Sequence, residues 1–197
     1  MTRPSIAGIV AAAGLGVRMG GPKADLVVDG VRLLDRAINL AQAGGCEPVL
    51  AVIGPRTRPP RDVRSVVNPS PGDGMRSSLA LGIGAVTGVP PREQPDAIAL
   101  LLVDQPGLTA EAIAAVVQSW RPGRISTGVV VGRDRRIRTH PVVMSPAQWQ
   151  AALILAGPDE GARRYLAQRA DLIDEVEVDV DPMDLDTPAD LDRWNRG

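Results

Sequence analysis

A glycine-rich stretch followed by two cations lies near the start of the chain, in VAAAGLGVRMGGPK (residues 10–23). Glycines leave backbone N–H groups open to an anion because no side chain covers them. Arg18 and Lys23 could then neutralise phosphate charge, the arginine through two parallel hydrogen bonds. The stretch is typical of a phosphate-binding loop, although glycine and charge are also common in solvated surface loops.

Two better-known phosphate motifs do not fit this stretch. A P-loop needs Gly-x-x-x-x-Gly-Lys-[Ser/Thr], and here Pro22 interrupts the motif and Ala24 replaces the hydroxyl. A dinucleotide loop needs Gly-x-Gly-x-x-Gly and an acid about 20 residues further on, but the glycine spacing differs and an arginine follows the second expected strand. We therefore interpret the loop as a triphosphate site whose cations stabilise a departing pyrophosphate.

Carboxylates that could hold a metal ion follow at two later points. Asp104 ends the most continuous apolar run, AIALLLV (residues 97–103), and the turn and helix cap after it are supplied by other residues. Mg²⁺ typically takes one or two carboxylates plus substrate phosphates, so Asp104 suits a magnesium ligand. In DVDPMDLD (residues 179–186) most acids are expected to be solvated, and one is a candidate second ligand. These acids are Asp179, Asp181, Asp184 and Asp186.

The chain has one histidine, His140, in an apolar stretch. A lone histidine there is more often a hydrogen-bonded structural residue, and the functional alternative is a contact to a second substrate. The arginines before it likewise suggest either a solvated hairpin tip or a clamp for a phosphate. These arginines are Arg133, Arg135, Arg136 and Arg138.

The composition excludes several classes of protein. With 22 basic and 23 acidic residues and 2% aromatics, neither a nucleic-acid footprint nor a base-stacking platform is expected. The single cysteine, Cys46, excludes an internal disulfide and a multi-cysteine zinc site, and is expected to be a buried hydrophobe near a helix end. The short apolar run near the N-terminus is interpreted as a buried strand, not a signal peptide. No run approaches a membrane span, so we expect a cytoplasmic protein.

Apolar runs alternate with helical patterns, which predicts a three-layer α/β/α sandwich around a mostly parallel, Rossmann-like sheet in a single domain (1–197). Ligands sit beyond the carboxyl ends of strands in such sheets, so Gly14 and Asp104 are expected at the same edge. The expected strands are Ile6–Ala12, Val49–Ile53, Val63–Val67, Ala97–Val103, two strands joined at Gly132–Arg135, and a late strand at the start of VEVDVDPMDLDTPADLDRW (residues 176–194). The expected helices are Leu33–Ala43, Met75–Val86, Ala110–Ser119 after an N-cap at Thr109, Trp149–Leu155, Ala162–Gln168 and one beginning near Pro188.

Five ordered motifs carry a resemblance to a known family: VAAAGLGVRMGGPK, LLVDQPGLT, RTHPVVMSP, EGARRYL and DLDTPADL. From Ile6 to Trp194 the sequence resembles the MobA-like nucleotidyltransferases, most closely the molybdenum-cofactor cytidylyltransferase (MocA-like) branch. The resemblance implies the nucleotide-diphospho-sugar transferase type of sandwich. It also implies transfer of a nucleoside monophosphate from CTP or GTP to the terminal phosphate of molybdopterin, with Mg²⁺ and release of pyrophosphate.

The resemblance also implies partners and a preferred base. The partners are a nucleotide and a pterin, with a molybdoenzyme or its chaperone as a protein partner, and neither nucleic acid nor membrane. Ala12-Ala13-Gly14 favours CTP, since cytidylyl enzymes tend to carry Ala-Ala-Gly there and guanylyl enzymes Ala-Gly-Gly. RMGGPK is equally at home in the guanylyl branch, so GTP stays an alternative.

Site residues follow from the same resemblance. It assigns Arg18, Lys23 and Asp104 to catalysis, and Asp104 and Asp186 to the metal. The acceptor side would include His140 and Arg76, a cation expected to face the site. The nucleotide-binding residues are Ala12, Ala13, Gly14, Gly16, Asn68, Gly74, Ser77 and Ser78. The sequence departs from the family at Arg76 and at Thr139, which would point to a different acceptor or a lost cofactor activity.

The mechanism expected is in-line attack of an acceptor phosphate on the α-phosphorus. Such a nucleophile is already ionised, so catalysis reduces to positioning and electrostatics. Other activities stay open: guanylyl transfer, transfer to a sugar phosphate or another small phosphorylated acceptor, a non-catalytic nucleotide-binding protein that delivers a cofactor, or an oxidoreductase that binds NAD.

Overall fold

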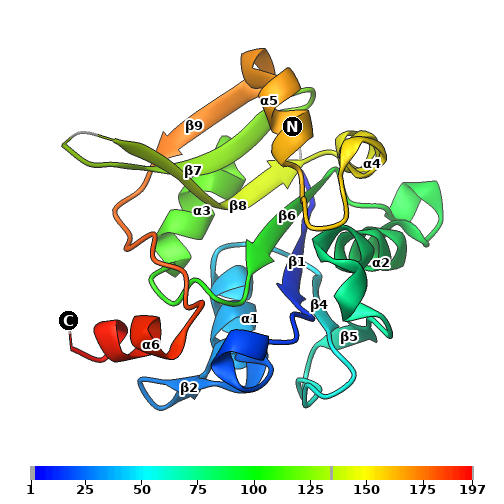
Figure 1. The fold of residues 1–197 in the computed structure, drawn as a ribbon. Helices are drawn as coiled ribbons and strands as arrows, with labels where there is room; N and C mark the ends of the chain where they lie inside the picture. The colour runs from blue at the N-terminus through cyan, green and yellow to red at the C-terminus, as the bar shows by residue number, and fades with distance from the viewer. Residues whose placement is uncertain (1–2, 134, 197) are drawn as a thin grey trace.

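The computed structural model describes residues 3–133 and 135–196, and within them a seven-stranded sheet has the order β5-β4-β1-β6-β8-β7-β9 (Figure 1). Strands β5, β4, β1 and β6 are parallel, β8 is antiparallel to both its neighbours, and β9 is parallel to β7. The sheet is therefore mostly parallel, as expected. Its strands are β1 Ile6–Ala12, β4 Val49–Ile53, β5 Arg64–Val67, β6 Ala97–Leu102, β7 Ile125–Val131, β8 Arg136–Met144 and β9 Ile173–Glu177.

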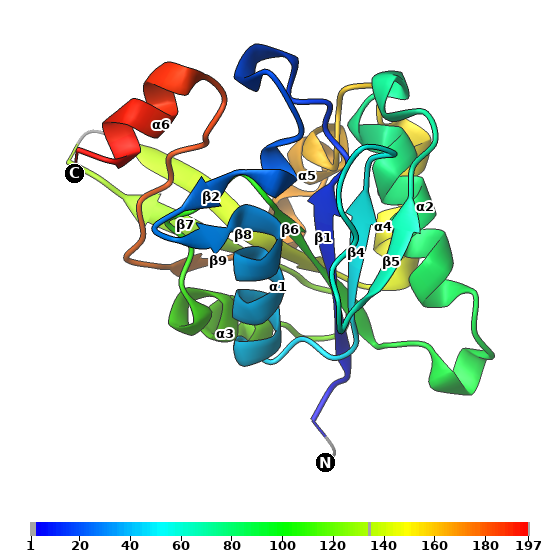
Figure 2. The same ribbon diagram turned by 90° about the horizontal axis from the view of Figure 1, so that it is seen from below.

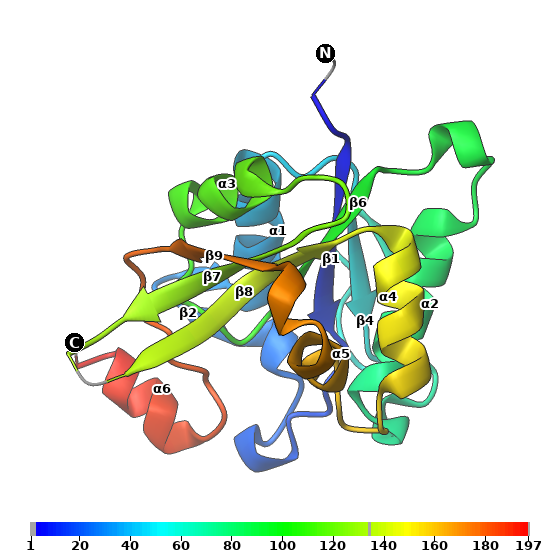
Figure 3. The same cartoon turned by 90° about the horizontal axis from the view of Figure 1, so that it is seen from above.

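Helices cover both faces of this sheet, which confirms the three-layer α/β/α sandwich (Figures 2 and 3). Helices α1 (Leu33–Ala43) and α3 (Ala110–Ser119) cover one face. Helices α2 (Met75–Thr87), α4 (Pro146–Leu155) and α5 (Arg163–Gln168) cover the other. No helix within the described ranges is long and apolar enough to cross a membrane.

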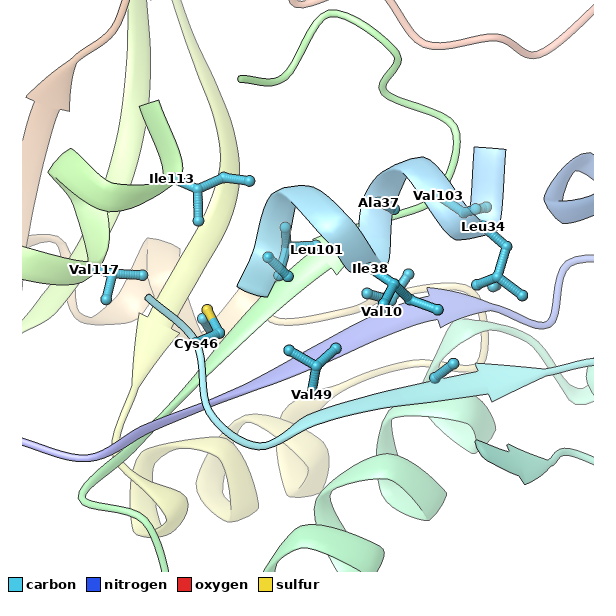
Figure 4. Close-up of a cluster of buried hydrophobic side chains, with 14 of the residues drawn as sticks. Val10, Leu34, Ala37, Ile38, Cys46, Val49, Leu101, Val103, Ile113 and Val117 are labelled. Carbon is cyan, nitrogen blue, oxygen red and sulfur yellow. The ribbon is translucent and has the colours of Figure 1, made fainter. Parts of the chain in front are cut away.

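Strand β1 lies at the centre of the core, and all seven of its residues are buried. Successive side chains point to opposite faces, so a strand covered on both sides reads as a continuous apolar run. Figure 4 shows one face, where Val10 of β1 packs with Leu34 and Ile38 of α1. Cys46 is buried in the same cluster, and burial raises the pKa of its thiol to about 12. The expectation of a structural cysteine near a helix end is confirmed.

Helix boundaries follow local capping signals. Helices α1 and α3 have the expected bounds, and Thr109 caps α3 by accepting a hydrogen bond from the Ala112 N–H at 3.2 Å. Helix α4 begins at Pro146, earlier than the expected Trp149. Ser145 and Gln148 form a capping box there, which starts the helix one turn sooner.

Two strand predictions need correction. A hairpin of β2 (Val27–Val28) and β3 (Val31–Arg32) was not expected, although Asp29 and Gly30, with φ of 51° and 77°, are a typical two-residue hairpin turn. The late strand β9 begins at Ile173, before the expected segment, because its residues pair in parallel with 125–129 of β7. The connection expected at 132–135 includes residue 134, which lies outside the described residues, and β7 and β8 flank it as predicted.

The last helix, α6 (Pro188–Trp194), lies beyond the two helical layers, beside the loops that follow β1 (Figures 1 to 3). Trp194 Nε1 donates to Asp29 Oδ2 at 3.2 Å, which joins the C-terminal segment to the β2–β3 hairpin. The segment between β9 and α6 therefore passes along the carboxyl edge of the sheet.

Candidate functional site

A cavity of about 400 Å³ opens at the carboxyl edge of the sheet. Strands β1 and β6 are parallel neighbours with Ala11 opposite Leu102, so the residues that follow the two strands lie side by side. The prediction that Gly14 and Asp104 share one edge is confirmed. The lining residues are Ala11, Ala13, Gly14, Arg18, Lys23, Pro71, Gly74, Met75, Ser78, Leu102, Val103, Asp104 and Asp159.

The loop after β1 folds tightly around Gly16. This residue has φ of +59°, and a Cβ built on it would lie 1.7 Å from the Gly21 carbonyl oxygen, so only glycine fits. The amides of Met19 and Gly21 both donate to the Gly16 carbonyl, at 2.8 and 3.2 Å. Gly14 differs, because a Cβ there would meet no described atom within 4 Å. Its backbone borders open cavity space, where a ligand could approach closely.

Lys23 lies between two carboxylates at one end of this cavity. Its Nζ is 2.7 Å from Asp104 Oδ2 and 2.5 Å from Asp186 Oδ1, and Arg18 Nη2 is 3.4 Å from Asp186 Oδ2. The Leu185 N–H donates to the Asp104 carbonyl at 2.9 Å, and the Leu185 side chain is fully buried. This contact anchors the C-terminal segment and brings Asp186 to the N-terminal loop.

The charges of this cluster shift one another's pKa values. Burial opposes the charged form of Lys23, but hydrogen bonds and charges from Asp104 and Asp186 outweigh it and raise the lysine pKa. The hydrogen bond from Lys23 lowers the pKa of Asp186. Burial raises the pKa of Asp184, and the negative charges of Asp104 and Asp186 add to that rise. Asp104 and Asp186 thus share Lys23, and the negative charge of Asp184 acts on the same cluster without a contact to the lysine.

Asp104 and Asp186 are the residues best placed to hold a metal ion. Their oxygens converge on the position of the Lys23 ammonium, and carboxylate oxygens are the ligands that Mg²⁺ prefers. Among residues 3–133 and 135–196, no group of three or more His, Cys, Asp or Glu side chains is arranged to hold a metal alone. A metal here would complete its coordination with ligand oxygens and water.

A second cavity of about 490 Å³ adjoins the first and shares Met75, Leu102 and Asp159 with it. Two ligands could therefore lie next to each other, one in each cavity. The remaining lining residues are Leu100, Thr127, Arg138, Thr139, His140, Val142, Trp149, Gly161, Ala162, Arg163, Leu166 and Ala167.

His140 and Gln105 connect the second cavity to the acidic cluster. His140 Nδ1 is 3.0 Å from Gln105 Oε1, and Gln105 Nε2 donates to Asp184 Oδ1 at 2.9 Å. Burial lowers the pKa of His140 to about 4 in spite of the nearby charge of Asp104, so the imidazole is neutral at pH 7. His140 is therefore hydrogen-bonded, as the structural interpretation of its sequence position expects, and it also lines a cavity; its contact to a second substrate stays a prediction.

Several expected site residues support the first cavity without lining it. Asn68 is buried, its Nδ2 donates to the hydroxyls of Ser77 and Ser78 at 2.9 Å each, and its Oδ1 accepts from the Ser70 N–H. These contacts fix the start of α2. Ala12, Gly16 and Ser77 are likewise absent from the lining, whereas Ala13, Gly14, Gly74 and Ser78 belong to it. Asn68 thus positions this part of the cavity wall through its hydrogen bonds to Ser77 and Ser78.

The expectation that Arg76 faces the site is wrong. Its side chain is exposed, and its Nε donates to the Leu153 carbonyl of α4 at 3.1 Å, away from both described cavities. Met75 and Ser78 share the helix face toward the cavity because they are three residues apart. Arg76 follows Met75 directly and therefore lies on another face.

The arginines of β8 are also accounted for. Arg136 and Arg138 both donate to Glu175 of β9, at 2.8 and 2.7 Å, and these hydrogen bonds lower the pKa of Glu175. Thr139 is buried, and a Cβ built on Gly128 of β7 would meet its Cγ2 at 2.9 Å, so the pair is closely packed. Gln105 and Asp159 were not predicted as site residues; the position of Gln105 directly after Asp104 is the signal that could have indicated it.

Comparison with known proteins gives consistent results. A family model described as the MobA-like NTP transferase domain matches residues 8–173. The chain is 34% identical over 199 residues to nicotine blue oxidoreductase of Paenarthrobacter nicotinovorans, an alignment that covers 96% of this chain and 93% of that protein.

Solved structures share the whole fold. A nucleotidyl transferase from Methanothermobacter superposes with a TM-score of 0.77 at 20% identity and covers 98% of both chains. Rv0371c of Mycobacterium tuberculosis H37Rv superposes with a TM-score of 0.77 at 25% identity over the full length of both chains. A complex of Rv0371c with manganese gives a TM-score of 0.72 at 24% identity, covering 96% of this chain and 97% of that one.

Proposed function

The chain belongs to the family of MobA-like NTP transferases, which are nucleotidyltransferase enzymes, and from this premise we propose that it transfers CMP from CTP to the terminal phosphate of molybdopterin. The observation that carries the proposal is the cavity in which the glycine loop, two cations and Asp104 meet. The adjoining cavity provides room for the acceptor. The reaction releases pyrophosphate.

The triphosphate would bind along the loop after β1. The open space beside Gly14 allows close approach of phosphate oxygens to the backbone. Arg18 is 67% exposed in its side chain, so it is free to reach the leaving pyrophosphate. Lys23 would move from its carboxylates to the phosphates as they enter. Both cations then carry negative charge that develops as the phosphoanhydride bond breaks.

The acidic cluster fits a divalent cation, because Asp104 and Asp186 already share a cation between them. Bound there, Mg²⁺ would shield the triphosphate charge and polarise the α-phosphoryl group. The manganese complex of the similar mycobacterial protein supports a divalent cation as such, without indicating which residues hold it.

The buried methyl group of Ala13 supports CTP over GTP. Ala13 is 3% exposed and lines the nucleotide cavity. A methyl group there narrows the floor relative to glycine, which favours the smaller pyrimidine. GTP is the alternative donor, and a different small phosphorylated compound is the alternative acceptor.

A second candidate function is supported by one observation. The 34% identity to nicotine blue oxidoreductase extends over nearly the full length of both proteins. We therefore also consider an oxidoreductase that binds a nicotinamide dinucleotide in the first cavity and an electron acceptor in the second. The glycine spacing of the loop does not favour a dinucleotide.

Pyrophosphate release tests the proposal. The purified protein is given Mg²⁺, molybdopterin and either CTP or GTP, and oxidation of NADH and NADPH is followed in parallel. Turnover with CTP is expected, and the Asp104→Asn variant is expected to lose it. Asp179→Asn is the control, because Asp179 is an exposed acid of the same segment. Normal pyrophosphate release by Asp104→Asn would overturn the metal assignment, and nicotinamide oxidation alone would favour the oxidoreductase.

A further inference from the structure

The hydrogen bonds of Gln105 fix the tautomer of His140. A carboxylate only accepts hydrogen bonds, so the Gln105 amide nitrogen faces Asp184 and its carbonyl oxygen faces His140. That carbonyl also only accepts, so the proton of the neutral imidazole lies on Nδ1. The other ring nitrogen, Nε2, therefore carries an available lone pair.

This lone pair is accessible. His140 Nε2 has no hydrogen-bond partner among the described residues. His140 is partly exposed, and the buried side-chain polar atoms that lack a partner in the same ranges belong to Thr57, Ser126 and Thr139. Because His140 lines the second cavity, an accessible nitrogen acceptor is available to a ligand there.

The surrounding wall is suited to an uncharged ring system. Leu100, Val142 and Trp149 line the cavity with apolar surface. The Arg138 guanidinium is already hydrogen-bonded to Glu175 at 2.7 Å, which reduces its attraction for another anion. Arg163 and Asp159, of opposite charge, are the other charged side chains that line this cavity, whereas Arg18 and Lys23 line the neighbouring one.

We propose that His140 Nε2 accepts a hydrogen bond from an O–H or N–H group on an uncharged ring portion of the acceptor, and that Gln105 is the positioning residue that holds this tautomer. The inference rests on the proposed function, since it takes the second cavity as the acceptor site. The inference adds which part of the acceptor lies in the second cavity, namely an uncharged ring that carries an O–H or N–H donor. A ring without a donor would leave Nε2 unpaired and is expected to bind about tenfold more weakly.

The tautomer is measurable directly because the chain has one histidine. Nitrogen NMR of protein labelled with ¹⁵N-histidine at pH 7 is expected to show the proton on Nδ1. Gln105→Leu is expected to release this preference, whereas Gln118→Leu, at an exposed glutamine, leaves the spectrum unchanged. A proton on Nε2 in the unaltered protein would overturn the proposal.

Ligand class is tested with three probes of one ring size: 2-naphthol, 2-methoxynaphthalene and 2-naphthyl phosphate. We expect 2-naphthol to bind about tenfold more tightly than its methyl ether and to shift the Nε2 resonance. In His140→Phe, checked for folding by circular dichroism, both neutral probes should bind alike. Equal binding of the neutral pair to the unaltered protein, or tightest binding of the phosphate, contradicts the inference.

These readouts separate the inference from the proposed function. Pyrophosphate release from CTP together with equal binding of the neutral probes removes the inference and leaves nucleotidyl transfer standing. Tighter binding of 2-naphthol than of its methyl ether, without any pyrophosphate release, keeps the inference and removes nucleotidyl transfer.

Discussion

Replacing Lys23 with methionine should destabilise the protein in a way that a divalent cation repairs. Methionine keeps the unbranched stem of the side chain but leaves Asp104 and Asp186 facing each other without the ammonium between them. Mg²⁺ should then bind between the two carboxylates of the variant. In the unaltered protein Lys23 already fills that position, so Mg²⁺ without nucleotide should change its melting temperature little.

The expected magnitude follows from burial. The side chains of Lys23 and Asp104 are 16% and 20% exposed, whereas that of Asp186 is 44% exposed. Loss of one partner costs about 3–5 kcal/mol in a buried pair, and an exposed pair is worth about 0.2–1 kcal/mol. A partly buried cluster should lie between these limits, at about 2 kcal/mol. For a chain of this size that corresponds to about 4–8 °C in melting temperature.

Thermal unfolding followed by circular dichroism, with EDTA or with saturating Mg²⁺, measures both effects. Metal at about 100 times its Kd would contribute about 2.7 kcal/mol, enough to restore the variant. Arg92→Met serves as the control, since the Arg92 side chain is 86% exposed and its ion pair within the described ranges is with neighbouring Glu93. A Lys23→Met variant that melts like the unaltered protein in EDTA, or equal stabilisation of both proteins by Mg²⁺, would contradict this prediction.

Three further predictions concern the loop, the histidine and the sheet edge. Gly16→Ala should cost about 2 kcal/mol or more in urea unfolding and weaken CTP binding, because a Cβ would collide with the Gly21 carbonyl at a positive φ. The pKa of His140 is about 4 in the folded chain against 6.5 for the free side chain, so the unfolded chain takes up a proton first. Stability should therefore fall between pH 6.5 and pH 4, and His140→Phe should lose that slope in urea titrations. Glu175→Gln should cost about 0.5–1 kcal/mol at pH 7, since Arg136 and Arg138 both donate hydrogen bonds to the carboxylate. The difference in free energy of unfolding between the variant and the unaltered protein should disappear as the pH falls through the lowered pKa of Glu175. A difference that stays the same at low pH would contradict this prediction.

Local patterns in the sequence were sufficient for much of the fold. The apolar runs at residues 6–12 and 97–102 predicted central strands, because a strand covered on both faces needs no polar alternation. Thr109 marked the start of α3 through its hydroxyl. The adjacency of Gly14 and Asp104 followed from topology, since parallel strands end at one edge.

Other features depended on contacts between segments far apart in the chain. Lys23 meets Asp186 across 163 positions, because a backbone hydrogen bond from Leu185 to Asp104 anchors an irregular segment that has no periodicity to read. The link between Gln105 and His140 depends on side-chain directions at a strand end.

The sequence by itself determined the layers of the fold, the glycine-rich loop with its two cations after the first strand and the carboxylate after the central strand, because each depends on residues close together in the chain. Only the tertiary structure decided that Lys23 occupies the point shared by two carboxylates and that Arg76 faces α4. It also decided that His140 contacts Gln105 and lines a second cavity. Those outcomes depend on how irregular segments dock and on which way side chains point, and spacing along a sequence carries neither.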